Sequence, residues 1–318
     1  MEQAQVTIIG LGLIGTSLGL ALQEVKTNFQ IVGHDREFNV AKKAAKLGAV
    51  DRAEWNLISA VEDADLIFLA IPVTGIRDTL QAIANDLKQG ALITDTASAK
   101  QQVMAWAEEL LPDHVNFVGG DPIVKRIGRG QAGASADLFR GSPYCVAPAR
   151  SADEESVRVL VQLISGLGAE PYFVDAAEHD GLVAGIAHLP IILSAAMVRA
   201  VTQSAGEHDL KRMAGQEFRS ITEFPSGDPA IFSDVCLTNG DNIIRWIDRM
   251  IAELHDWRDI INSQDAEQLE ELFIEVLETR ARWIGEIDTP SSMQEALDNT
   301  GGGLRSMLFG SRLGRPKS

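Results

Sequence analysis

The sequence Val6-Thr7-Ile8-Ile9-Gly10-Leu11-Gly12-Leu13-Ile14-Gly15 decides the fold. A β-branched run leads directly into the pattern GxGxxG, and a helical pattern follows from Gly15 to Val25. In this context the three glycines predict a turn that binds the pyrophosphate of a dinucleotide. Gly10 permits the tight turn, Gly12 lets the backbone approach the phosphates, and Gly15 lets helix and strand pack closely. We expect the first helical turn, with Leu13 and Ile14, to offer its free N–H groups to the anion.

A carboxylate identifies the expected cofactor. Asp35 stands twenty residues after Gly15, at the end of the second expected strand. A carboxylate there accepts hydrogen bonds from the ribose hydroxyls and repels a 2′-phosphate, which predicts NAD. Arg36 beside it leaves NADP open, because an arginine can accommodate that phosphate. We also place Pro72, which ends the apolar strand at 65–71, in the cofactor site.

The rest of the chain divides into two patterns. Short apolar runs alternate with helical patterns up to about residue 150, which is typical of βαβ units and a parallel sheet. We therefore predict an α/β fold: an N-terminal Rossmann domain with a doubly wound parallel sheet over 1–149, and an all-helical substrate and dimerisation domain over 150–288. Residues 289–318, rich in glycine and arginine, are expected to form a mobile tail.

The second half indicates a homodimer. Its apolar residues recur at three- and four-residue spacing, as in Ile243, Ile247, Met250, Ile251 and Leu254. Long helices with broad apolar faces need a partner, and a second subunit is the natural one. The most apolar stretch, 182–201, contains a histidine and a proline, and we interpret it as a buried helix and not a membrane span.

Composition excludes several classes of protein. The formal net charge of −17 argues against nucleic-acid binding, which needs cationic surface. The two cysteines, Cys145 and Cys236, are far apart, so no metal site is expected. No secretory signal pattern opens the chain, and we expect a cytoplasmic protein.

Further motifs resemble the prephenate/arogenate dehydrogenase family over roughly residues 5–287. They are the glycine turn, the strand ending at Pro72, and then in order TDTASAK at 94–100, GGDPI at 119–123, DLF at 137–139, HD at 179–180 and AHLP at 187–190. The resemblance implies a dimeric enzyme that oxidises and decarboxylates a cyclohexadienyl acid on the route to tyrosine. It also implies that Ser98 lies near the nicotinamide and that His188 contacts the substrate.

Two positions depart from the family pattern. Asp121 stands where the family has a histidine that hydrogen-bonds the ring hydroxyl of the substrate, and Glu223 stands where it has an arginine that holds a substrate carboxylate. Asp121 can still accept a hydrogen bond, whereas glutamate repels the ligand that arginine binds. Lys125, Arg126 and Arg129 follow closely, and some of them could supply the lost positive charge from another direction. We place Lys125, Arg219, Glu223 and His188 in the substrate site.

Three hypotheses remain open at this stage. The first is a prephenate- or arogenate-type dehydrogenase in which Asp121, Ser98 and His188 are the catalytic residues. The second is the same chemistry on an amine-bearing substrate, favoured by the two carboxylates Asp121 and Glu223. The third is a dinucleotide-binding dimer with little or no catalysis.

Overall fold

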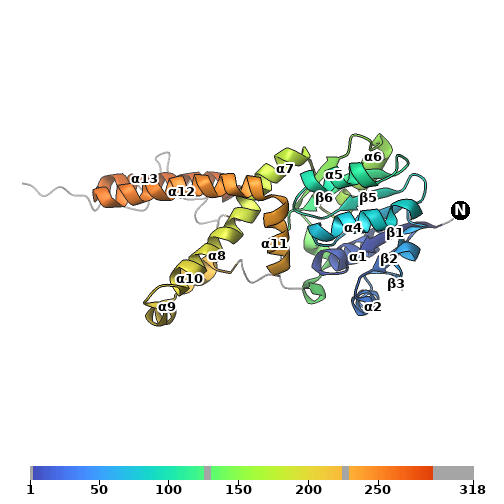
Figure 1. Ribbon diagram of the computed structural model, residues 1–318, viewed down its shortest axis with the longest axis horizontal. Helices are drawn as coiled ribbons and strands as arrows, with labels where there is room; N and C mark the ends of the chain where they lie inside the picture. Colours follow the sequence, from blue (N-terminus) through green and yellow to red (C-terminus); the bar gives the residue numbers. More distant parts are fainter. Residues whose placement is uncertain (1–2, 125–129, 224–228, 289–318) are drawn as a thin grey trace, which may run out of the picture. The chain divides into compact units, whose positions relative to one another are not determined.

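The structure, a computed structural model, describes residues 3–124, 130–223 and 229–288 (Figure 1). Lys125 and the expected tail at 289–318 lie outside the described residues. One sheet contains eight strands: β1 (Ala4–Ile9), β2 (Phe29–His34), β3 (Arg52–Glu54), β4 (Leu66–Leu69), β5 (Leu92–Asp95), β6 (Asn116–Pro122), β7 (Pro143–Pro148) and β8 (Glu170–Phe173).

The strand order in this sheet is β3-β2-β1-β4-β5-β6-β7-β8. Every neighbouring pair is parallel except β6 and β7, which run antiparallel. The order reverses between β1 and β4, which is the doubly wound arrangement that the sequence predicted. The short strand β3 and the antiparallel pair were not predicted, and β6 runs further than expected, so that Asp121 lies within a strand.

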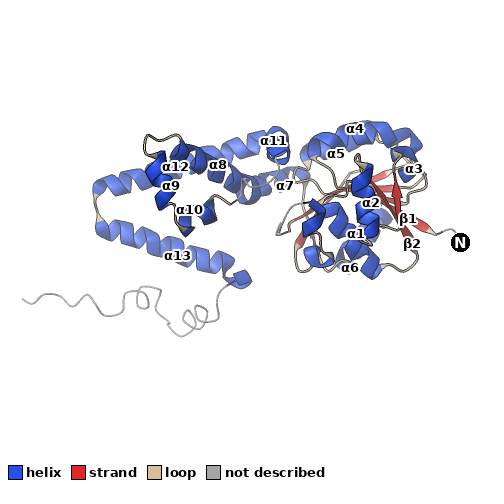
Figure 2. Ribbon diagram, turned by 90° about the horizontal axis from the view of Figure 1, so that it is seen from below, coloured by secondary structure: helices blue, strands red, loops and turns tan. Residues whose placement is uncertain are grey.

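Helices cover both faces of the sheet, as Figure 2 shows. The helices here are α1 (Leu13–Val25), α2 (Phe38–Lys46), α3 (Leu57–Val61), α4 (Val73–Ile83), α5 (Gln101–Leu110) and α6 (Glu154–Gly166), with short 3-10 turns at Ala84–Asp86, Gly130–Gly133 and Ala136–Phe139. Alternate residues of β4 point to opposite sides. Phe68 packs in the core cluster with α1, α2 and α6, and Ile67 in the cluster with α3, α4 and α5. Burial on both faces explains the continuously apolar strands.

The second half is helical, as predicted. It contains α7 (Ala176–Val183), the π-helical turn η4 (Ala184–His188), α8 (Leu189–Thr202), α9 (Glu207–Met213), α10 (Gln216–Ile221), α11 (Pro229–Thr238), α12 (Gly240–Ser263) and α13 (Ala266–Asp288). Contacts divide the chain into one unit up to Ile247 and a second from Asp248, which holds the rest of α12 and α13. The domain boundary expected between 149 and 150 stays a prediction.

The π-helical turn follows from Pro190. Proline has no N–H and its ring clashes with the carbonyl four residues earlier, so an ordinary helix cannot pass through it without distortion. In η4 the N–H of Leu189 instead donates to the carbonyl of Ala184, five residues back. Trp246 packs directly on Gly185, where an added Cβ would lie 2.6 Å from the indole ring. The π-helical turn and the packing of Trp246 together fix the backbone position of His188, the last residue of η4.

The helical stretch Ala176–Thr202 is less buried than the sequence analysis predicted. It is long and apolar enough to cross a membrane by length and composition alone, and in the single chain only 28% of its most apolar window is buried. Leu182, Ile186 and Met197 are exposed, whereas His179, Asp180 and His188 are buried. In a single copy of the chain the expected burial is therefore observed on one side of this helix and not on the other, and burial of the exposed side stays a prediction.

Gly120 tests how tightly β6 packs at its carboxyl end. A Cβ at this position would lie 2.6 Å from the backbone oxygen of Asp95 and 2.9 Å from the ring of Tyr144. We expect Gly120→Ala to lower the free energy of unfolding by about 2–4 kcal/mol, because strand and ring must move apart. Chemical denaturation measures this. The matched control is Gly75→Ala in α4, where the nearest neighbour would lie at 3.7 Å. It should be neutral or stabilising by less than about 1 kcal/mol, and equal losses in both variants would contradict this account.

Candidate active site

The predicted cofactor residues, together with Ser98 and Asp121, lie at the carboxyl ends of parallel strands. Because parallel strands end at the same edge of a sheet, these residues share that edge, where ligands bind in open α/β sheets. They are Gly10 after β1, Asp35 after β2, Pro72 after β4, Ser98 between β5 and α5, and Asp121 near the end of β6. The helices α1 and α4 begin after β1 and β4, the neighbouring strands between which the strand order reverses.

The glycine turn has the shape that a dinucleotide needs. Gly10 has a φ of +89°, and an added Cβ would lie 2.5 Å from the backbone oxygen of Ala70. At Gly15 a Cβ would lie 1.9 Å from the oxygen of Gly10, so helix and turn touch there. Gly12, by contrast, faces open space, and no side chain caps the N-terminus of α1. The free N–H groups at this helix start fit a pyrophosphate.

Asp35 is held against the same turn. Its Oδ2 accepts a hydrogen bond from the backbone N–H of Leu11, and its Oδ1 accepts one from Glu37, both at 2.9 Å. The carboxylate is therefore fixed beside the phosphate-binding loop, where a ribose is expected. Arg36 next to it is exposed.

A fully buried ion pair lies next to the end of β6. The ammonium group of Lys100 pairs with Oδ2 of Asp95, and both side chains are completely buried. Asp95 also accepts hydrogen bonds from the backbone N–H groups of Ala97 and Gly120, at 3.0 and 3.1 Å. Burial raises the pKa of Asp95, while Lys100 and these N–H groups oppose that effect. The pair ties β5, β6 and the start of α5 together.

Asp121 takes part in a chain of hydrogen bonds with a histidine. Its Oδ2 lies 3.1 Å from Nε2 of His179, and Nδ1 of that ring lies 2.9 Å from Oδ1 of Asp180. Asp180 in turn accepts the backbone N–H groups of Lys100 at 2.6 Å and Gln101 at 3.0 Å, at the start of α5. Elements far apart in the sequence thus meet at one imidazole ring.

The hydrogen bonds around His179 favour the positively charged form of its imidazole ring. Burial alone disfavours the imidazolium, but hydrogen bonds with Asp121, Asp180 and Cys145 outweigh it and raise the pKa of His179 to about 10. The pKa of Tyr144 on the neighbouring strand is raised as well, by burial and by the charges of Asp95 and Asp121, and this keeps the phenol neutral.

His188 is joined to the same network. The Nδ2 of Asn239 donates to the backbone oxygen of Asp180 at 2.8 Å and lies 3.3 Å from Nδ1 of His188. Because a carbonyl oxygen only accepts, this contact settles which end of the Asn239 amide faces the ring. The indole N–H of Trp246 takes the next carbonyl, that of Gly181, at 3.0 Å. Asp180 therefore contacts His179 directly through its carboxylate, and its backbone carbonyl holds Asn239 against His188.

The remaining predicted residues are not brought into this network. Ser98 is half-buried in the loop before α5. Arg219 on α10 and Glu223 after it are exposed, and among the described residues no hydrogen bond joins either to Asp121. Sequence reasoning named the His179-Asp180 motif without giving it a role and missed Asn239 altogether. The only signal for His179 was its place in an ordered series of motifs.

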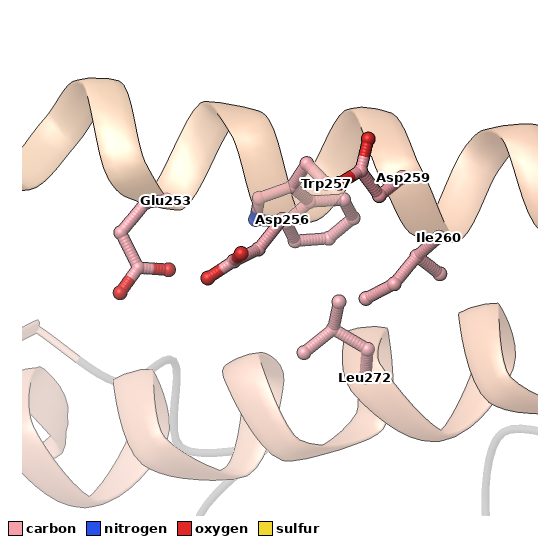
Figure 3. A pocket seen from close by; sticks show the side chains of 6 residues that line it. All are labelled: Glu253, Asp256, Trp257, Asp259, Ile260 and Leu272. Carbon is pink, nitrogen blue, oxygen red and sulfur yellow. The ribbon is translucent and has the colours of Figure 1, made fainter.

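The second unit has a hollow of its own between α12 and α13. It measures about 430 Å³, and Figure 3 shows the residues that line it: Glu253, Asp256, Trp257, Asp259, Ile260 and Leu272. Carboxylates form one part of the lining and apolar side chains the other. Because none of the predicted site residues lines it, we interpret it as a groove between two packed helices.

Gly12 offers a direct test of the dinucleotide site. We expect Gly12→Ala to weaken NAD binding by roughly 10-fold or more, since its Cβ would occupy space that the phosphates need. The melting temperature of the free protein should stay within about 2 °C, because nothing lies within 4 Å of the added atom. Calorimetric titration and thermal melts measure the two effects. Unchanged affinity in the folded variant would contradict this binding mode.

Comparisons with known proteins agree with this geometry. A family model described as "Prephenate dehydrogenase, nucleotide-binding domain" matches residues 18–173, and "Prephenate dehydrogenase, dimerization domain" matches residues 175–275. The first match begins after Gly15, so the glycine turn is not part of it. The assignment of that turn to the dinucleotide depends on its geometry in the structure.

Individual relatives point the same way. The prephenate dehydrogenase of Bacillus subtilis is 35% identical over 273 residues, which span 85% of this chain and 74% of that protein. Two solved structures are similar: a prephenate dehydrogenase from A. aeolicus in complex with hydroxyphenyl propionate and NAD+ (TM-score 0.83, 26% identity, 91% of this chain and 99% of that one) and the arogenate dehydrogenase of Synechocystis (TM-score 0.75, 27% identity, 88% and 99%). This chain therefore belongs to the prephenate dehydrogenase family and is an NAD-dependent dehydrogenase of that type.

Proposed function

We propose that this dehydrogenase oxidises and decarboxylates a cyclohexadienyl acid that carries a ring hydroxyl, and that Asp121 is the residue that accepts the hydrogen bond of this hydroxyl. The observation that carries the proposal is the Asp121 carboxylate at the carboxyl edge of the sheet, one strand beyond the loop of Ser98. This is the edge at which the glycine turn would hold NAD.

The reaction balances without an external acid or base. The C–H bond at the hydroxyl-bearing carbon breaks and its electron pair leaves as hydride, which the nicotinamide accepts when NAD is bound. The bond to the carboxylate breaks, its electrons complete an aromatic ring, and carbon dioxide departs. The product is a phenol that keeps the hydroxyl proton. Asp121 therefore needs only to accept a hydrogen bond while positive charge develops at the ring carbon.

The surroundings of Asp121 suit this task. Within the residues that the structure describes, its Oδ1 has no hydrogen-bond partner, and 6% of the side chain remains exposed. We assign Ser98 and His188 to the nicotinamide and the substrate, as the family resemblance implies.

The charge around Asp121 favours a hydroxyl over an ammonium group. An ammonium substrate would need an unpaired carboxylate, but Asp121 already contacts a ring whose pKa is raised to about 10. The amine-bearing alternative therefore has weaker support. Arg219 and Glu223 lie on exposed surface in one chain, and we assign them, with Lys125, to the part of the substrate remote from the ring.

Turnover tests this function directly. We expect the protein to reduce NAD with prephenate or arogenate, and more slowly, if at all, with 4-amino-4-deoxyprephenate. Asp121→Asn should lower kcat by roughly 100- to 1000-fold, because an amide is a weaker acceptor for the developing charge. The control Asp137→Asn replaces a carboxylate that is 70% exposed and should change kcat less than twofold. If the intact protein oxidises none of the three acids, the proposed function is wrong.

We further propose that the helical half forms a homodimer in the cytoplasm. Residues 175–275 match a dimerization domain, and the α12 and α13 helices expose Ile251, Leu254, Val276 and Leu277 in a single chain. Exposed apolar side chains of this kind are what a second copy of the chain would cover, and in the other unit α8 exposes Met197.

Light scattering after gel filtration tests the dimer. The protein should elute at twice its chain mass of 34.4 kDa. We expect Leu254→Glu combined with Leu277→Glu to shift the mass toward one chain, since two buried carboxylates per subunit are costly without partners. Glu271→Lys, on the opposite side of α13 by helical spacing, should leave the dimer intact. A monomeric parent protein would contradict the proposal.

A further inference from the structure

We propose that His179 is a positioning residue for this reaction: its imidazolium donates a hydrogen bond from Nε2 to Oδ2 of Asp121 and thereby directs Oδ1 toward the substrate hydroxyl. The inference rests on the proposed function, in which Asp121 accepts that hydroxyl, and it adds a residue that holds the acceptor in place. It also explains how a carboxylate can stand where the resemblance implies a histidine.

The proton positions follow from the partners of the ring. The carboxylate of Asp180 accepts two backbone N–H groups, at 2.6 and 3.0 Å, at the N-terminus of α5, where a negative charge is favoured. Since this carboxylate is an acceptor, Nδ1 of His179 at 2.9 Å is a donor. Nε2 faces the second carboxylate, that of Asp121, at 3.1 Å and donates as well. The ring therefore carries two protons and a positive charge.

Within the described part of the chain, the other charged and titratable groups around the ring can be named element by element. On β7, Cys145 pairs in register with Asp121 and contributes a hydrogen bond to His179. At the start of α5, the ammonium group of Lys100 is engaged by Asp95 and leaves only its backbone N–H for Asp180. Asp121 on β6 and Asp180 on α7 contact the ring directly, and the neutral phenol of Tyr144 on β7 is buried near Asp121. The ring of His179 is 1% exposed and contacts both carboxylates, an arrangement that favours the imidazolium.

The Asp121 carboxylate on β6 is held in place by residues of α7 and α5. The ring is held at both nitrogens, and its partner Asp180 is held by α5, so the orientation of the Asp121 carboxylate is set by a rigid chain of contacts. A hydrogen bond to one oxygen leaves the other to face a ligand. If His179 had only a structural role, its ring would contribute to the stability of the fold. The turnover rate of the folded enzyme would then be the same whichever nitrogen of position 179 donated a hydrogen bond.

Two substitutions separate these roles. The amide nitrogen of glutamine can replace Nε2, and that of asparagine can replace Nδ1. We expect His179→Asn to lower kcat by roughly 10- to 100-fold with little change in the KM for NAD, and His179→Gln to keep kcat within about fivefold of the parent. Equal rates in both folded variants, or a loss confined to the KM for NAD, would overturn the positioning role.

An NMR titration tests the pairing without any turnover. With ¹³C/¹⁵N-labelled histidine, the ring of His179 can be identified among six by its absence in the His179→Gln spectrum. We expect it to remain doubly protonated at about pH 8, where an ordinary histidine is neutral. In Asp121→Asn its pKa should fall from about 10 toward the ordinary value of 6.5, while Asp137→Asn should leave it unchanged.

The outcomes distinguish this inference from the proposed function. A neutral His179 ring in the folded parent at about pH 8 would overturn the inference even if the enzyme oxidises prephenate. A doubly protonated ring in a protein that oxidises none of the three acids would instead count against the proposed function alone. Where His179→Gln does not fold, the ring of His179 is identified in the parent protein as the histidine whose signals change in Asp121→Asn and stay unchanged in Asp137→Asn, so the test stands.

Discussion

Buried carboxylates need partners, and this requirement organises the carboxyl edge of the sheet. An ionised carboxylate without hydrogen bonds or a countercharge is very costly in a protein interior. Asp95 meets the requirement through Lys100 and two backbone N–H groups, and Asp180 through the start of α5 and the ring of His179. Because each partner comes from a different element, satisfying these charges also sets where β5, β6, α5 and α7 meet.

The aspartate at position 121 depends on this framework. The resemblance places a histidine there, and replacing it removes both a ring and a proton-binding group. The neighbouring His179 brings an imidazole to the same point from α7, with Nε2 at 3.1 Å from the carboxylate. The chemistry of the proposed reaction asks only for a hydrogen-bond acceptor at the hydroxyl, and an oriented carboxylate is one. The change at 121 is thus compatible with the reaction type of the family.

Local patterns predicted much of this molecule. The glycine turn, the carboxylate of Asp35 and the strands β1, β2, β4 and β5 follow from short-range spacing and from burial on both faces of the sheet. The pairing of Asp121 with His179 could not be predicted in this way, since 58 residues separate them and only the packing of α7 against the sheet edge joins them. For the same reason neither the antiparallel pairing of β6 with β7 nor the role of Asn239 was predicted. The exposed apolar side chains on α8 belong to a single copy of the chain, and we expect a second copy to cover them.

The most direct measurement is a crystal structure of the protein with NAD+ and hydroxyphenyl propionate, the ligand pair bound by the A. aeolicus relative. The account predicts that the phenol oxygen lies within hydrogen-bond distance, about 2.5–3.2 Å, of Oδ1 of Asp121, while Oδ2 keeps its contact with Nε2 of His179. A phenol oxygen more than about 4 Å from Asp121 and bonded to a different side chain would contradict it.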